Sequence, residues 1–276
     1  MYPTIIDFGT IPLGPIRIPL AIHSYGLMMA LAFLTVMFIL QRELVRKKLE
    51  PQLASSIIFA AAIGGIVGAK LYSAVQDGSF SISELFSNSG LVWYGGFIGG
   101  IAAVLFVIHR SPNPILPTLD AVGPLLLLGY GIGRIGCFLS GDGDYGPPSD
   151  LPWAMAFPNG TVPTNVPVHP TPLYETGMSL IGFGLLWTIR KRKEKMWGWM
   201  IGGGLILTGI ERFIAEFWRL NSPVLFKLTT AQFFSILLMI IGGYFIYWTT
   251  HRSIPAEGVN APVSPPPRRK RKGRKA

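Results

Sequence analysis

Residues 133–146 combine one arginine, two carboxylates and five glycines in fourteen positions (GRIGCFLSGDGDYG). Arg134 lies near the end of an apolar segment, and Asp142 and Asp144 follow it in the glycine-rich part. An arginine in or beside a membrane needs a partner, because charge is costly to bury in lipid. Glycine allows backbone N–H groups to approach a bound anion closely. The stretch therefore predicts a basic, amide-lined pocket for an anionic group at the membrane surface.

A second arginine lies further along the chain, in the sequence ERFIAEFWR (211–219). Arg212 and Glu216 are four residues apart, so both face one side of a helix. Taken alone, the pair could be an ion pair that only neutralises two buried charges. However, Arg212 and Arg134 are expected at similar depth, near the same ends of their apolar segments. Two guanidinium groups at one depth can bind a phosphate, which accepts paired hydrogen bonds.

Two further segments carry polar or small residues at the start of an apolar run. His23 could accept a proton, because its unperturbed pKa lies near neutrality, or it could be an interfacial side chain. Tyr25 could contact a ligand or belong to an aromatic belt at the membrane interface. Gly95 and Gly96 could present N–H groups to a phosphate. Small residues also allow two helices to pack closely, which is the structural alternative for both glycines.

The composition favours a membrane protein. Only 14% of the 276 residues are charged, whereas soluble domains average about 25%. The net charge of +10 could suggest a nucleic-acid partner, but much of the excess lies within residues 268–275 at the C-terminus, so no such partner is expected. Cys137 is the only cysteine, which excludes an intrachain disulfide and a multi-cysteine metal site. The four histidines show no metal-ligand spacing. We therefore expect neither a metal nor a cofactor.

Seven apolar runs approach the roughly 20 residues that a helix needs to cross the hydrocarbon layer. Backbone groups in lipid are satisfied only in helices or closed barrels, and these runs are too long for barrel strands. The sequence thus predicts an all-α polytopic membrane protein with seven transmembrane helices. The runs are residues 19–41, 53–75, 91–109, 118–138, 171–189, 197–217 and 231–250.

The loop charges predict an orientation. Eighteen of the 24 Lys and Arg residues fall in the loops of one side and the C-terminal tail. By the positive-inside rule, the N-terminus is outside, the C-terminus is cytoplasmic and the long loop 139–170 lies on the outer face. Residues 1–253 are expected to form the membrane domain. Residues 254–276 are rich in proline and then basic, which predicts a disordered cytoplasmic tail that binds anionic lipid.

Five segments in order resemble the bacterial prolipoprotein diacylglyceryl transferase family. They are IHSYGLM (22–28), YGGFIG (94–99), GRIGCF (133–138), HPTPLYE (169–175) and RFIAEFWR (212–219). The resemblance implies transfer of the diacylglyceryl group of phosphatidylglycerol to the lipobox cysteine of a preprolipoprotein signal peptide. A thioether forms and glycerol-1-phosphate leaves. It also implies a multi-pass protein of the bacterial cytoplasmic (inner) membrane, in contact with membrane lipids.

The resemblance assigns roles to individual residues. Arg134 and Arg212 match the essential arginines of the family, and fixed cations would stabilise the departing phosphate. Glu216 would hold Arg212 in place, and Tyr94 stands at a catalytic position. The substrate-binding residues implied or indicated by the pattern are Arg134, Tyr25, His23, Gly95, Gly96, Gly136, Asp142, Asp144, Gly146 and His169.

The chain departs from the family pattern at three places. Tyr94 replaces a common histidine, and a free tyrosine with a pKa near 10 is a poor base. Cys137 replaces a common asparagine and is interpreted as a small packing residue. The loop that follows is longer and more acidic, so either Asp142 or Asp144 could take the signature's acidic role. Two alternatives remain: a divergent member with another lipid donor or acceptor, and a non-catalytic anion-binding or transport protein. The sequence shows no clear internal repeat of the kind found in many transporters.

Overall fold

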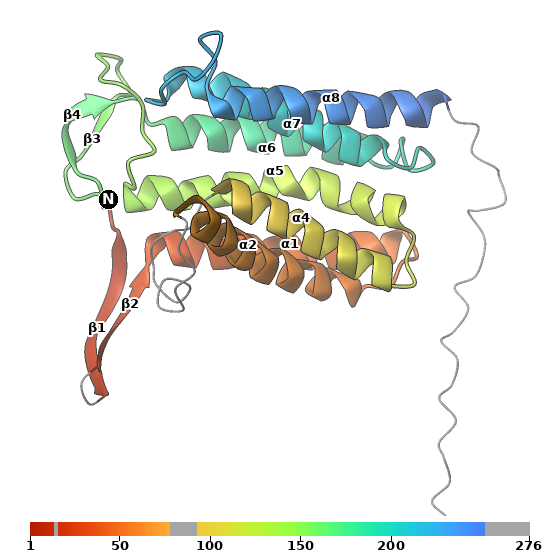
Figure 1. The fold of residues 1–276 in the computed structure, drawn as a ribbon, viewed down its shortest axis with the longest axis horizontal. Helices are drawn as coiled ribbons and strands as arrows, with labels where there is room; N and C mark the ends of the chain where they lie inside the picture. The colour runs from red at the N-terminus through yellow and green to blue at the C-terminus, as the bar shows by residue number, and fades with distance from the viewer. Residues whose placement is uncertain (14–15, 78–92, 252–276) are drawn as a thin grey trace, which may run out of the picture.

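Seven long helices lie side by side in the part of the chain that the structure describes (Figure 1). This computed structural model describes residues 1–13, 16–77 and 93–251, without the side chains of residues 11–20, 76–77 and 93–94. The helices are α1 (Ser24–Arg46), α2 (Leu53–Asp77), α4 (Trp93–Arg110), α5 (Ile115–Ser140), α6 (Thr171–Ile189), α7 (Trp199–Ala215) and α8 (Thr230–His251). Each predicted apolar run overlaps one of them. The predicted tail, residues 254–276, lies outside the described residues.

The first predicted span is wrong at its start. Pro19–His23 belong to strand β2 (Ile16–His23), which pairs antiparallel with β1 (Thr4–Leu13), and the helix begins only at Ser24. Proline is unfavourable inside a helix because it lacks a backbone N–H, and here Pro19 pairs with Thr10 across the hairpin. The hairpin projects from one end of the bundle (Figure 1).

The all-α prediction also missed a second small sheet. Strands β3 (Met155–Phe157) and β4 (Thr164–Val168) pair antiparallel within the long loop. They lie at the end of the bundle where α5 ends and α6 begins (Figure 1). Such short strands leave no long alternating pattern in the sequence, which is why they were not predicted.

Four helices are long and apolar enough to cross a membrane by length and composition: α1, residues 53–75 of α2, α5 and α8. Residues 95–110 of α4 form a shorter apolar helix. Helices α6 and α7 have 19 and 17 residues, and they carry Glu175, Glu211 and Arg212. The chain is therefore a helical membrane protein, and its seven crossings stay a prediction.

Glycines bring the helices into backbone contact. A Cβ added to Gly95 on α4 would lie 2.4 Å from the carbonyl oxygen of Gly68 on α2. A Cβ on Gly123 of α5 would lie 2.6 Å from the carbonyl oxygen of Met200 on α7. Close backbone approach of this kind favours association of helices in lipid, where hydrophobic burial gives little driving force. The resulting apolar core includes Leu44, Leu125 and other residues of α1, α2, α4 and α5.

Candidate active site

Three arginines and three carboxylates gather where α5 and α7 end and α6 begins. Their ion pairs connect α5, the loop after it, α6 and the short helix η1 (Glu216–Trp218) that follows α7. We call this group the arginine cluster. Its members are Arg134, Arg212, Arg219, Asp144, Glu175 and Glu216.

Glu175 lies at the centre of the arginine cluster, and its side chain is fully buried. It pairs with Arg134, and its Oε1 atom lies 3.0 Å from Nη1 of Arg212. The hydroxyl of Tyr130 donates to the same oxygen over 3.2 Å, and Arg219 lies 3.7 Å away. A buried carboxylate requires such partners. Glu175 therefore joins the two arginines that the sequence placed at one depth.

Arg212 and Glu216 form the expected ion pair, with Nη2 and Oε2 2.9 Å apart. Helix α7 ends at Ala215, so the pair spans the junction between α7 and η1. The side-chain amide of Asn221 donates to Glu216 over 2.8 Å. Arg212 thus has two carboxylates fixed on different elements, which restricts its orientation.

Asp144 lies in the loop after α5 and bridges two arginines of other elements. Its Oδ2 lies 2.5 Å from Arg134, and its Oδ1 lies 2.5 Å from Arg219. Burial opposes ionisation of this carboxyl group, but the hydrogen bond from Arg219 and the charge of Arg134 outweigh it and lower its pKa to about 2. Asp144 is therefore ionised at neutral pH.

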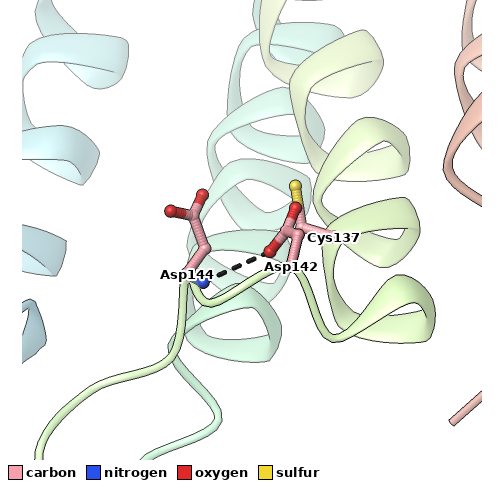
Figure 2. A group of neighbouring side chains, drawn as sticks. All are labelled: Cys137, Asp142 and Asp144. Atoms are coloured by element: carbon pink, nitrogen blue, oxygen red, sulfur yellow. Dashed lines mark hydrogen bonds between the residues drawn. The ribbon is translucent and has the colours of Figure 1, made fainter. Parts of the chain in front are cut away.

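Asp142 has a different environment. Its carboxyl group lies beside the Cys137 sulfur and accepts a hydrogen bond from the backbone N–H of Asp144 over 3.2 Å (Figure 2). One donor atom from each of these three residues lies within 4.8 Å of the others, a spacing that could hold a metal ion. Arg134 donates to both Cys137 and Asp144, and its positive charge disfavours a cation there. The contacts of Arg134 therefore argue against a metal ion at this position.

Gly146 and His169 hold the loop that carries Asp142 and Asp144 in place. The carbonyl oxygen of His169 accepts a hydrogen bond from the N–H of Gly146 over 2.9 Å. The Nδ1 atom of the His169 ring lies 3.2 Å from the Tyr174 hydroxyl. A Cβ on Gly146 would lie 2.3 Å from the carbonyl oxygen of Trp218, so only glycine fits. Both residues hold the loop against α6 and η1.

The remaining predicted residues lie on α1, α4 and α5. Tyr25 packs against Gly136, where a Cβ would lie 3.4 Å from the Tyr25 Cα atom, and its side chain is 43% exposed. Tyr25 is therefore next to the α5 turn that carries Arg134. His23 lies at the end of β2, with its Nδ1 3.4 Å from the Thr4 hydroxyl. No ion pair or hydrogen bond between described residues joins His23 to the arginine cluster.

Two predicted glycines and one tyrosine lie at the start of α4. The nearest atoms to an added Cβ on Gly95 and on Gly96 belong to α2, so both glycines allow these helices to pack together. This contact matches the structural alternative for the pair and does not test ligand binding by their N–H groups. The side chain of Tyr94 lies outside the described part of the chain.

The sequence interpretation assigned no role to Glu175, Arg219 or Tyr130. Glu175 and Arg219 were inside the segments that carry the family resemblance, and an acidic residue in an apolar run is itself a signal. Glu211 was also passed over, although it lies in the sixth run, residues 197–217. It is 3% exposed, and neither carboxylate oxygen has a hydrogen-bond partner among the described residues. Tyr130 gave no signal, because one tyrosine in an apolar helix is ordinary.

Fold and site define a class: a helical membrane protein with arginines and carboxylates paired at one end of its helices. The family described as prolipoprotein diacylglyceryl transferase matches residues 14–248 of the sequence. The chain belongs to this family. The resemblance seen in the five segments is therefore confirmed.

Curated relatives carry the same name, phosphatidylglycerol–prolipoprotein diacylglyceryl transferase. A protein of Clostridium tetani is 34% identical over 235 residues, which cover 81% of this chain and 91% of that protein. One from Pseudomonas fluorescens is 33% identical over 275 residues, 94% of this chain and 97% of its own. One from Leptospira interrogans is 32% identical over 231 residues, 73% and 72% of the two chains. The similarity thus covers nearly the whole protein.

Proposed function

We propose that this protein transfers the diacylglyceryl group of phosphatidylglycerol to the thiol of a lipobox cysteine in a preprolipoprotein. A carbon–sulfur bond forms as the glyceryl carbon–oxygen bond breaks. The bonding electron pair goes to the phosphate oxygen of glycerol-1-phosphate, and the thiol proton is released. Family membership supports the reaction. In this chain, the supporting observation is the arginine cluster, where residues of the segments that resemble the family come together from separate elements.

Arg134 and Arg212 are the residues proposed to stabilise the leaving phosphate. Both guanidinium groups contact Glu175, each at a different oxygen of this fixed carboxylate. Fixed donors stabilise developing charge without reorganisation at the moment of reaction. Glu216 is proposed to position Arg212, since it is held by Asn221 on its other side.

Tyr94 is the residue proposed to take part in the proton-transfer step, because it stands where the family commonly has a histidine. A tyrosine is a poor base at neutral pH, and a histidine is a better one. Tyr94→His is therefore expected to retain or increase the transfer rate, and Tyr94→Phe to reduce it. Equal rates for Tyr94→Phe and the unmodified protein would remove Tyr94 from the mechanism.

Tyr25, His23, Asp142, Gly136, Gly146 and His169 are proposed to contact or shape the site for the lipid headgroup. Tyr25 and Gly136 have the best support, because they pack together one turn from Arg134. Gly95 and Gly96 remain proposed donors of backbone N–H groups. His23 has the weakest support, since its recorded partner is Thr4.

The proposed topology has seven crossings, an outer N-terminus and a cytoplasmic C-terminus in the bacterial inner membrane. The asymmetric distribution of Lys and Arg supports this orientation. It would put the arginine cluster and the long loop on the outer side, and residues 254–276 in the cytoplasm as a basic tail. Reporter fusions after residues 145 and 253 test the orientation, with opposite sides expected for the two positions.

The activity is tested with purified protein, phosphatidylglycerol vesicles and a peptide that bears a lipobox cysteine. A diacylglyceryl mass gain on the cysteine peptide, but not on a serine peptide, is expected. Arg134→Ala should lose the product, whereas Arg190→Ala, which changes an arginine paired with Glu43 elsewhere, should keep it. Product formed only with a phospholipid other than phosphatidylglycerol would indicate a divergent member that uses another lipid donor. No product with any lipid from folded protein would contradict the transferase.

A further inference from the structure

We propose that Asp144 is a displaceable partner of Arg134 and Arg219, and that a phosphate group takes the place of its carboxylate on binding. The inference relies on the proposed function for the source of the phosphate. It relies on the geometry of the arginine cluster for the position. Asp144 then specifies where the headgroup binds and how readily the phosphate product leaves.

The two oxygens of Asp144 each contact a different arginine. Oδ2 lies 2.5 Å from Arg134 on α5, and Oδ1 lies 2.5 Å from Arg219, the residue after η1. Two guanidinium groups that share one small anion through separate oxygens are also arranged for a phosphate, which offers several acceptor oxygens. The carboxylate therefore marks a position that suits a phosphate.

Asp144 differs in burial from the other two carboxylates of the arginine cluster. Its side chain is 33% exposed, whereas those of Glu175 and Glu216 are fully buried. Glu175 and Glu216 also accept hydrogen bonds from Tyr130 and Asn221. A carboxylate displaced from Arg134 and Arg219 could be hydrated only at Asp144. Moving either buried glutamate would leave a charge without a partner, which is strongly unfavourable.

The charge balance of the arginine cluster favours exchange over addition. Three guanidinium groups already face three carboxylates. A phosphodiester that joined them would bring a fourth negative charge into a buried site, and a like charge at short distance is unfavourable. If Asp144 leaves as the phosphate arrives, the number of negative charges beside the arginines stays the same.

Two glycines with positive φ angles precede Asp144 in the loop. Gly141 and Gly143 have φ angles of 59° and 94°, conformations that glycine adopts without strain. Once the carbon–oxygen bond has broken, the return of Asp144 to Arg134 and Arg219 would expel the phosphate product. Displacement has to occur by competition and not by protonation, because the pKa of Asp144 is about 2. Asp144 should therefore stay ionised, and compete with the phosphate, throughout about pH 6 to 8.

The test measures binding of inorganic phosphate and of glycerol-1-phosphate to the full-length protein in detergent, by calorimetry. Asp144→Asn removes the competing charge and should bind both probes about fivefold more tightly, the factor expected for one partly exposed ion pair. Asp150→Asn is the matched control, because Asp150 is an exposed carboxylate of the same loop that forms no ion pair with a described arginine, and phosphate affinity should not change in that variant. Asp144→Glu keeps the charge and should bind like the unmodified protein. Asp144→Ser replaces Asp144→Asn if the latter does not fold.

Transfer kinetics give the second measurement. The KM for phosphatidylglycerol and the inhibition constant of glycerol-1-phosphate should both fall in Asp144→Asn, with kcat reduced by slower product release. Weaker phosphate binding would mean that Asp144 positions the arginines, and it would overturn the proposal. So would tighter binding of free phosphate with an unchanged KM for the lipid. Tighter binding without any transfer activity would uphold the anion site and contradict the proposed function.

Discussion

The protein buries charge at both ends of its helical bundle, in two different ways. At the end opposite the arginine cluster, Asp120 is 3% exposed and accepts the backbone N–H groups of Gly198 and Ile201 over 2.7 and 3.0 Å. These donors lie at the start of α7, whose helix dipole favours a carboxylate there. Glu43, also buried, pairs with Arg46 and Arg190 at 2.7 and 3.5 Å.

The arginine cluster differs in the origin and accessibility of its partners. It takes charges from α5, α6, η1 and a loop, and one of its carboxylates is partly exposed. Asp120 instead accepts hydrogen bonds from fixed backbone N–H groups, which are not cations that could exchange Asp120 for a ligand. Burial of charge alone therefore does not mark a functional site. A convergent set of cations with one accessible partner does.

The largest expected effect contrasts Arg134 with Arg190. Arg134→Gln should reduce kcat/KM for transfer by about 10²–10³, the usual loss when one fixed stabilising donor is removed. Arg190→Gln removes one of two arginine partners of Glu43 and should leave the rate of the folded protein nearly unchanged. Mass spectrometry of the peptide gives the rates, and size exclusion gives the folded fraction. Similar losses in both variants would break the distinction between the two ends.

The next effect concerns the positioning of Arg212. Glu216→Gln removes one of its two carboxylate partners, while Glu175 remains. A small misplacement of a catalytic group can reduce the rate by up to about 10²-fold, so kcat should fall while the pH profile keeps its shape. Glu194→Gln, which removes an exposed partner of Arg46, is the control. A change in the shape of the pH profile would instead make Glu216 a proton-transfer group.

The sequence predicted the helices well because membrane spans have a strong apolar signal, and each of the seven runs overlaps one helix. It failed at Pro19–His23, where an apolar run continues through a strand into a helix without a change in composition. Hydrophobicity reports burial or lipid contact, and it does not distinguish a hairpin from the first turn of a helix. The fold was therefore predictable except where the secondary structure changes within one apolar run and where short strands form in the long loop.

The arginine cluster could be predicted only in part. The i, i+4 spacing of Arg212 and Glu216 is local, so their pairing could be predicted directly. The contacts of Glu175 with Arg134 and of Arg219 with Asp144 join residues 41 and 75 positions apart. No spacing rule reports such pairs, because they depend on how α5, α6 and η1 pack. The choice between Asp142 and Asp144 could not be made from the sequence. In the structure, Asp144 pairs with described arginines and Asp142 does not, and which of the two takes the family's acidic role stays a prediction.

A smaller effect separates packing from binding at Gly95. Gly95→Ala places a Cβ 2.4 Å from the Gly68 carbonyl oxygen, and Gly68→Ala places one 2.3 Å from the Gly95 carbonyl oxygen. Overpacking usually destabilises by about 1–3 kcal/mol, so both variants should lower the midpoint of thermal unfolding alike. If Gly95 also binds substrate through its N–H, only Gly95→Ala should raise the KM for phosphatidylglycerol. Equal KM values in the folded variants would leave Gly95 with a packing role alone.

The smallest expected effect on catalysis is at Asp120. Asp120→Ala leaves the N–H groups of Gly198 and Ile201 without their acceptor and should destabilise the protein by about 1–3 kcal/mol. Asp120→Asn keeps one acceptor oxygen and should lose less. In both variants the folded fraction should transfer lipid at the normal kcat, because the contacts of Asp120 are with the far end of α7. Denaturant unfolding and single-turnover rates on the same samples measure the two quantities. A reduced kcat with normal stability would mean that the start of α7 transmits its position to Arg212 at the other end, so the two charged regions would not be independent.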